Sequence, residues 1–284
     1  MTLNDHYIVS RMSSDEIHTA IDWANKEGWN PGLHDATCFY QTDPNGFFAG
    51  KLNNRIIAIG SAVVYDDHFA FFGFYVVHPD YRGKGYGLEL TRARLAYIGA
   101  RNAGLDGVIK NLPIYERIGF KLAYNNARYY GINLPRPLQE NNAIVPLSTV
   151  HFDQICAYDR LHFPAQREGF LTCWINQKGG KSLGYIEHDK LLGYGVIRPC
   201  YRGFKIGPLF ANDPTIAEDL FIHLAKHAKN LPIYLDIPVC NQQAMDLVKR
   251  YQLEKVFETA RMYLKESPEV HIGQIYGITS FELG

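Results

Sequence analysis

Apolar positions in the first part of the chain follow two periods, one typical of strands and one typical of a helix. Short apolar or alternating runs are separated by turn-forming residues such as Asn53 and Asn54, which predicts antiparallel strands joined by tight turns. The predicted strands are residues 7–9, 47–52, 55–64 and 69–77. Apolar residues at helical spacing after Ser13 predict a helix that ends near Gly28. The stretch from there to Pro44 has neither period and is expected to be irregular.

The run at residues 69–77 is the strongest signal in the chain. It is continuously apolar apart from one glycine and is far too short to span a bilayer, so it predicts a strand buried on both faces. It leads through Pro79 into a glycine-rich turn at residues 82–87. A helix is expected over residues 86–101, capped by Gly104. A short strand at 108–109, a short helix and turn at 113–120, and a pair of strands within 121–132 complete this part.

The order of elements repeats after residues 134–142, which are rich in Pro and Asn and are expected to be a linker. Strands are predicted at residues 144–147, 191–198, 206–211, 232–237 and around 260–263, and helices at 152–161, 215–227 and 242–251. An offset of 133 residues carries Arg128 to Arg261 and Tyr130 to Tyr263. We therefore predict two tandem α+β units, residues 1–133 and 143–284, each a mixed, mostly antiparallel sheet flanked by helices.

The composition limits the partners. The chain of 284 residues has 29 Lys plus Arg and 29 Asp plus Glu, and this zero formal charge argues against nucleic acid or an anionic membrane as the main partner. The five cysteines are an odd number without a CxxC pair, so we expect reduced thiols. No signal-peptide pattern and no long apolar run is present, and a cytoplasmic location is expected.

Residues 82–87, Arg-Gly-Lys-Gly-Tyr-Gly, have the composition of an anion-binding turn. The N–H groups at a helix start are unpaired and lie at the positive end of the helix dipole, so they attract phosphate. Glycine lets that backbone approach an anion where a Cβ would clash. Two common nucleotide-binding turns fit less well. A P-loop needs Gly-Lys-Ser or Gly-Lys-Thr, and a Rossmann turn needs an acidic residue that closes a second strand.

The stretch Val77-x-Pro79-x-x-Arg82-Gly83-Lys84-Gly85-Tyr86-Gly87 resembles the pyrophosphate-binding motif, [RQ]-x-x-G-x-[GA], of the GNAT superfamily of acyl-CoA-dependent N-acetyltransferases. A second family feature, Tyr-Glu-x-x-Gly-Phe, stands at residues 115–120, so the resemblance covers residues 7–132. It implies acetyl-CoA as co-substrate, held by Val76, Val77, Arg82, Gly83, Lys84, Gly85, Tyr86 and Gly87. No metal is expected.

The second unit has no such turn. Residues 215–220, Thr-Ile-Ala-Glu-Asp-Leu, stand in its place without a glycine, and the nearby carboxylates would repel a pyrophosphate. We therefore expect one coenzyme per chain, bound by the first unit. A duplicated unit can replace the partner surface of a dimer, so a monomer is expected, with an acceptor pocket between the two units. The candidates for its wall are Trp29, His34, Asp35, Trp174 and Asp236.

Acyl transfer to an amine needs a polarised thioester carbonyl, a neutral amine and a protonated leaving thiolate. The resemblance places the carbonyl against the backbone N–H groups near Val76 and Val77 and gives Tyr115 the role of general acid, the alternative being a packed core tyrosine. Many relatives have a glutamate base on the strand at residues 69–77, and this chain has none there. Candidates elsewhere are His34, Asp35, His78 and Asp236, and deprotonation through water stays open.

These observations favour an N-acetyltransferase that moves an acetyl group from acetyl-CoA to the amine of a small molecule by direct attack in a ternary complex. Two alternatives stay open. A protein or peptide N-acetyltransferase would need an open, acidic groove for a basic tail. A non-catalytic acyl-CoA-binding regulatory protein would not need Tyr115.

Overall fold

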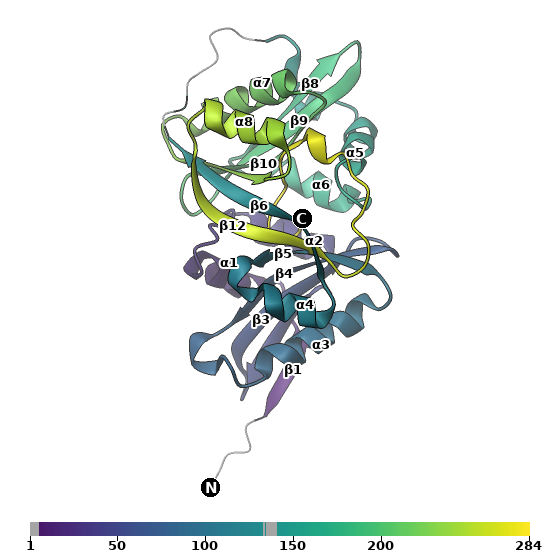
Figure 1. Cartoon of the computed structure of the whole chain (residues 1–284), viewed down its shortest axis with the longest axis vertical. Coiled ribbons are helices and arrows are strands. Elements are labelled where there is room, and N and C mark those ends of the chain that lie inside the picture. The colour runs from purple at the N-terminus through teal and green to yellow at the C-terminus, as the bar shows by residue number, and fades with distance from the viewer. Residues whose placement is uncertain (1–5, 133, 135–140) are drawn as a thin grey trace.

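The computed structural model describes residues 6–132, 134 and 141–284, and it consists of two units stacked along the long axis of the molecule (Figure 1). Most of the expected linker, residues 135–140, lies outside the described residues. Among the residues that the structure describes, none of the helices combines the length and the apolar character needed to cross a bilayer.

The first unit has six strands and four α-helices among its described residues. They are β1 (Tyr7–Arg11), α1 (Ile17–Lys26), α2 (Asp35–Thr42), β2 (Phe47–Leu52), β3 (Arg55–Val64), β4 (Phe69–Val77), α3 (Tyr86–Ile98), β5 (Asn102–Val108), α4 (Leu112–Ile118) and β6 (Lys121–Gly131). The predictions for β2, β3 and β4 are confirmed. Others are wrong: α2 forms in the stretch expected to be irregular, Gly99 rather than Gly104 ends α3, and residues 121–131 form one strand rather than two.

The second unit repeats much of this order. Its elements are β7 (Ile144–Pro146), α5 (Phe152–Arg160), α6 (Glu168–Trp174), β8 (Lys181–Glu187), β9 (Lys190–Pro199), β10 (Phe204–Ala211), α7 (Pro214–Ala225), β11 (Ile233–Pro238), α8 (Gln242–Arg250), β12 (Glu254–Tyr263) and β13 (Ile275–Gly277). The sequence pattern missed α6, β8 and β13 and gave the other elements to within a few residues.

The strands of the two units form one continuous sheet, in the order β1-β2-β3-β4-β5-β12-β6-β11-β10-β9-β8-β7 among the described residues, with β13 beside β10. The last long strand of each unit therefore lies in the other unit: β12 pairs with β5, and β6 pairs with β11 (Figure 1). Side chains that alternate along β3 pack into two cores, with Ile59 and Val63 facing α1 and α2, and Ala58 and Ala62 facing α3.

Each exchanged strand brings one buried arginine to an aspartate of the other unit. Arg128 of β6 lies opposite Asp236 of β11 and donates two hydrogen bonds to its carboxylate, at 2.6 and 2.7 Å. Arg261 of β12 makes the same bidentate contact with Asp106 of β5, at 2.8 and 2.7 Å. Because Arg128 and Arg261 are related by the 133-residue offset, the two pairs are equivalent contacts of a duplicated unit. Two buried ion pairs thus add to the backbone hydrogen bonds that join the two units within the sheet.

The expectation of five reduced thiols is wrong. Cys38 of α2 and Cys173 of α6 form a disulfide, and Cys156, Cys200 and Cys240 are free. The two partners lie 135 positions apart in the sequence and in different units, so no local spacing pattern could reveal the pair. The disulfide is a second covalent connection between the units.

Replacing Arg128 by Met should lower the free energy of unfolding by about 3–5 kcal/mol, because it leaves the carboxylate of Asp236 buried without its partner. Adding Asp236→Asn should recover part of that loss, since the amide removes the uncompensated charge. Urea unfolding measures both. The matched control is Arg250→Met, which breaks the more exposed pair with Glu218 and should cost about 0–1 kcal/mol. Equal effects of the two single substitutions would contradict the structural role given to the buried pair.

Thiol titration of the denatured, unreduced protein should detect three cysteines, and five after reduction. Cys38→Ser with Cys173→Ser should leave the first number unchanged and lower the thermal midpoint, since the covalent link between the units is lost. A titration of five thiols without reductant would contradict the disulfide.

Candidate active site

The candidate site lies where β4 and β5 separate. Their parallel pairing runs only from Phe69 opposite Asn102 to Phe72 opposite Leu105. On the other edge of β4 the register against β3 shifts beyond Gly73, and Phe74 takes a φ of 50°, a left-handed conformation that is costly for a bulky residue. This bulge turns the second half of β4 away from β5. A cavity of about 420 Å³ opens in the gap.

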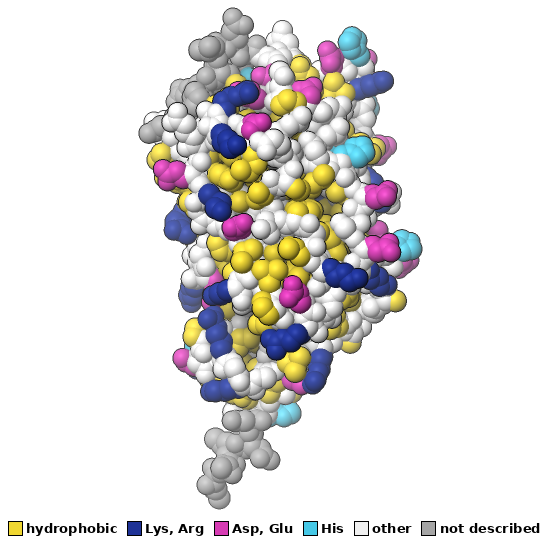
Figure 2. Space-filling model, in the orientation of Figure 1, with side chains coloured by type: hydrophobic (Ala, Val, Ile, Leu, Met, Phe, Trp, Pro, Cys, Tyr) yellow, Lys and Arg dark blue, Asp and Glu magenta, His cyan; other side chains and the backbone are white. Residues whose placement is uncertain are grey.

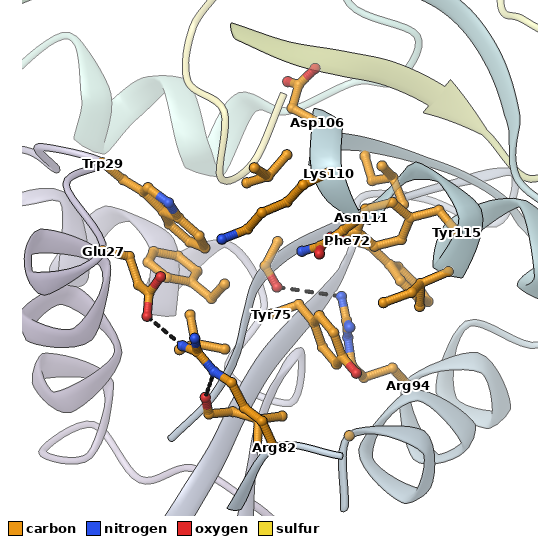
Figure 3. Close-up of a pocket in the computed structure, with 18 of the residues that line it drawn as sticks. Glu27, Trp29, Phe72, Tyr75, Arg82, Arg94, Asp106, Lys110, Asn111 and Tyr115 are labelled. Carbon is orange, nitrogen blue, oxygen red and sulfur yellow. Dashed lines mark hydrogen bonds and ion pairs between the residues drawn. The ribbon is translucent and has the colours of Figure 1, made fainter. Parts of the chain in front are cut away.

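Five parts of the chain build the cavity wall. They are β4 with the glycine turn after it, α3 with Arg94, the segment from β5 through a 3-10 turn (Ile109–Asn111) to α4, the end of α1 with Trp29, and β12 with residues 281 and 282. Figure 3 shows Tyr75, Arg94 and Tyr115 on one side of this space and Glu27 and Trp29 on the other, with Lys110 reaching in between them. The cavity therefore draws on both units of the chain.

The backbone of Val77 faces the cavity side of β4. The next N–H, that of His78, donates to the carbonyl of Ile57 on β3. Successive residues of a strand direct their N–H groups to opposite edges, so the N–H of Val77 points away from β3, toward the gap. Its carbonyl points the same way and accepts a hydrogen bond from Arg82 Nε at 2.7 Å. Val76 also lines the cavity, and a thioester carbonyl placed in the gap would meet the N–H of Val77.

The glycine turn takes the conformation that its sequence indicates. Gly83 and Gly85 have φ values of 76° and 89°, where a side chain would be strained. The first bonds of α3 run from the N–H groups of Leu88 and Glu89 to the carbonyl of Gly85, so the N–H groups of Gly85, Tyr86 and Gly87 precede the helical ladder and are free for an anion. Both positive φ values thus serve to open the helix start toward the cavity.

The two basic side chains of the glycine turn, Arg82 and Lys84, differ in their position relative to the cavity. Arg82 lines the cavity and is fixed by an ion pair with Glu27 at 2.7 Å, drawn as a dashed line in Figure 3. Lys84 does not line the cavity, and its Nζ donates to the carbonyl of Asp80. Of the eight residues assigned to the coenzyme, the Lys84 side chain is the one placed outside the cavity wall.

Tyr115 lies in the cavity wall with its ring packed on β5. A Cβ added to Gly107 would come within 2.5 Å of that ring, so glycine is needed there for the tyrosine to take its place. Burial raises the pKa of the Tyr115 phenol, although Arg94 and a hydrogen bond with Asn111 act in the opposite direction. The hydroxyl is consequently protonated at neutral pH and is available as a proton donor.

Arg94 of α3 is buried under the same wall. It donates to the carbonyl of Ser61, and its guanidinium lies 4.3 Å from the ring centroid of Phe72. Burial lowers the pKa of Arg94 to about 10. The sequence pattern gave this residue no special role, since an arginine on a helix is most often exposed.

Of the five residues expected in the acceptor wall, the structure places one at the cavity. Trp29 lines the cavity, while His34, Asp35, Trp174 and Asp236 do not. Asp35 and Asp236 are fully buried in ion pairs with Arg198 and Arg128. Trp174 is buried as well, donating from its ring nitrogen to the carbonyl of Gly207, and His34 stands before the first turn of α2. The structure therefore does not bring these four residues into the wall of this cavity.

Instead, the second unit contributes Phe257 and Thr259 of β12, and residues 281 and 282 follow them into the same wall. Sequence reasoning missed all four. One signal was available: the segment at residues 275–284 is apolar apart from a few small polar residues and a single acidic residue, Glu282.

In the second unit the helix start equivalent to the glycine turn is closed. Asp213 caps α7, and its carboxylate accepts hydrogen bonds from the N–H groups of Thr215 and Ile216 at 2.8 and 3.0 Å. These are the donors that an anion would need, so the geometry agrees with the loss of the glycines. Within the described part of the chain, no group of three His, Cys, Asp or Glu side chains is placed to hold a metal ion.

Comparison with known proteins agrees with this geometry in both units. The model of the acetyltransferase (GNAT) family matches residues 14–120, and that of the acetyltransferase (GNAT) domain matches residues 155–277. The chain is 29% identical over 273 residues to the holothin acyltransferase of Pseudoalteromonas sp. (strain SANK 73390), covering 96% of this chain and 92% of that protein.

Two solved structures share the tandem fold. An inferred acetyltransferase from Pyrococcus horikoshii aligns with a TM-score of 0.83 at 22% identity, over 98% of this chain and 96% of its own. A tandem GNAT protein from the clavulanic acid biosynthesis pathway aligns with a TM-score of 0.64 at 12% identity, over 92% and 100%. With a GNAT match in each unit and a cavity at the separation of β4 and β5, the chain belongs to the GNAT acyltransferases as a tandem member.

Proposed function

We propose that this protein transfers an acetyl group from acetyl-CoA to the amine of a small molecule, by direct attack within a ternary complex. The observation that carries the proposal is one cavity that extends from the glycine turn, past the N–H of Val77 and the hydroxyl of Tyr115, to a wall supplied by β12 and residues 281 and 282. Both substrates can therefore meet in one space without a covalent enzyme intermediate.

In this mechanism the residues of the first unit hold the donor. The pyrophosphate of the coenzyme lies on the N–H groups at the start of α3, with Arg82 beside it. The thioester carbonyl accepts a hydrogen bond from the N–H of Val77, which polarises the carbonyl and stabilises the oxyanion after attack. Tyr115 then donates its proton to the departing thiolate.

The aromatic lining of the cavity favours a small acceptor over a peptide. Phe257 and Phe281 lie there with their ring centroids 6.0 Å apart, and Trp29 contributes a third aromatic surface. A peptide would need a groove that continues across the surface. We extend the proposal to a monomer, because the two units of one chain already form one continuous sheet.

The direct test measures release of free CoA thiol from acetyl-CoA in the presence of single amines. The panel contains 2-phenylethylamine, tyramine, tryptamine, histamine, spermidine and amino acids, and a lysine-rich peptide represents the protein-acceptor alternative. At least one small amine should accelerate thiol release and appear as its acetamide by mass spectrometry. Thiol release that no amine or peptide accelerates, with tight acetyl-CoA binding, would favour the regulatory alternative and refute the proposed function.

Gly85→Glu should abolish coenzyme binding, because it strains a residue with φ of 89° and puts a negative charge where the pyrophosphate lies. The matched control is Gly179→Glu, a positive-φ glycine (φ 73°) at an exposed turn of the second unit, with the same charge change. Calorimetry should give one coenzyme per chain for the wild type and this control, and none for Gly85→Glu. Two coenzymes per chain, or unchanged affinity in Gly85→Glu, would contradict the assignment.

Tyr115→Phe should lower kcat about 10²-fold or more while coenzyme affinity stays near that of the wild type, since only the proton donor is lost. Tyr97→Phe is a suitable control: its hydroxyl bonds to Asp43 away from the cavity lining. If Tyr115→Phe stays within a few-fold of the wild type, the thiolate is protonated by water and Tyr115 only packs on β5.

A further inference from the structure

Glu282 is a buried carboxylate without a hydrogen-bond partner among the residues that the structure describes. Its exposed fraction is 2%, and within the described part of the chain neither Oε1 nor Oε2 accepts a hydrogen bond. Leaving a buried carboxylate unsatisfied is costly, and native structures seldom do so without a functional reason. Glu282 is among the residues that line the same cavity as Tyr115.

The backbone that carries Glu282 is firmly held. A Cβ added to Gly73 would lie 2.0 Å from the carbonyl oxygen of Glu282, so this segment packs directly on β4 at the glycine where β4 leaves β5. On either side, the N–H of Leu283 donates to Ser280 Oγ at 3.0 Å and the hydroxyl of Tyr65 donates to the carbonyl of Leu283 at 2.8 Å. These contacts fix the backbone around Glu282, so the missing hydrogen bonds of its carboxylate do not come from a poorly packed segment.

A second polar group in this wall is also unpartnered. Thr259 Oγ1 of β12 is buried, and no hydrogen bond to it is present among the described residues. Thr259 and Glu282 lie in one wall with the rings of Phe257 and Phe281. Apolar surfaces with two unsatisfied polar groups, one of them anionic, form a site for a compact cationic ligand that has an apolar body.

Two buried cations act on Glu282 electrostatically, but neither uses it as an ion-pair partner. Arg128 is bound to Asp236 through both oxygens of that carboxylate, and Lys205 lies 4.0 Å from the same aspartate. The charge of Glu282 favours the charged form of both cations, yet neither Glu282 oxygen has a hydrogen-bond partner within the described part of the chain.

We propose that Glu282 binds the ammonium group of the acceptor and takes the proton that must leave before attack. This inference rests on the proposed acetyl transfer. The ammonium N–H bond breaks and its proton passes to a Glu282 oxygen. The freed electron pair of nitrogen forms the C–N bond, and the C–S bond breaks with its electrons on sulfur. The thiolate takes a proton from Tyr115, the second proton of the amine nitrogen returns through water to Tyr115, and Glu282 releases its proton to solvent.

The experiment uses the full chain with acetyl-CoA and the panel amine that gives the fastest thiol release. Glu282→Gln should lower kcat/KM for that amine about 10²-fold or more, with acetyl-CoA affinity unchanged. The matched control is Glu269→Gln, an exposed glutamate of the same region, which should keep wild-type kinetics. Glu282→Ala should be equally slow, and formate should restore its turnover in a saturable way where chloride at equal ionic strength does not.

The rescue experiment compares the turnover of Glu282→Ala with and without formate. A folding defect of this variant would therefore not produce the expected result. Glu282→Gln within a few-fold of the wild type, or Glu282→Ala that formate does not rescue, would overturn the assignment while the proposed function stands. If no panel amine accelerates thiol release by the wild type, the proposed function is refuted, and the role of Glu282 is refuted with it.

Discussion

The exchange of β6 and β12, fixed by two buried Arg–Asp pairs, is the constraint on which the site depends. β12 pairs with β5 through a backbone ladder in which Arg261 lies opposite Asp106, and β6 pairs with β11 in the equivalent way with Arg128 opposite Asp236. A buried bidentate pair tolerates little change of register, because a shift by one residue would leave four charges without partners. The two pairs therefore fix where Phe257 and Thr259 of β12 stand relative to the glycine turn.

This arrangement gives a structural role to the second unit, whose helix start is already occupied by the carboxylate of Asp213. Asp213 occupies the helix start where a pyrophosphate would lie, so selection for coenzyme binding does not account for the second unit. Its strand β12 and the segment that follows supply the wall of the first unit's cavity instead.

The sequence predicts those parts of the molecule that local chemistry determines. The boundaries of β2, β3 and β4 and the conformation of the turn at Gly83 and Gly85 follow from hydrophobic runs and from residues with special φ values. The sequence does not predict contacts between residues far apart in the chain. The disulfide of Cys38 joins positions 135 apart in the sequence. The 133-residue offset matches equivalent residues of the two units, so it does not show that the units exchange a strand.

The misplaced acids have a common physical cause. Asp35 and Asp236 looked like site residues because carboxylates near aromatic and apolar segments are unusual, yet each meets an arginine from a distant strand. Among the carboxylates discussed for the site, a structural acid is paired with a cation in the folded chain, and a catalytic acid is not. The sequence alone does not show which acids have such a partner. Asp106 is neutralised by Arg261, although it borders the cavity. Glu282 lies near the same buried charges, and within the described part of the chain neither of its oxygens has a hydrogen-bond partner, which is why the proposed proton transfer is assigned to it.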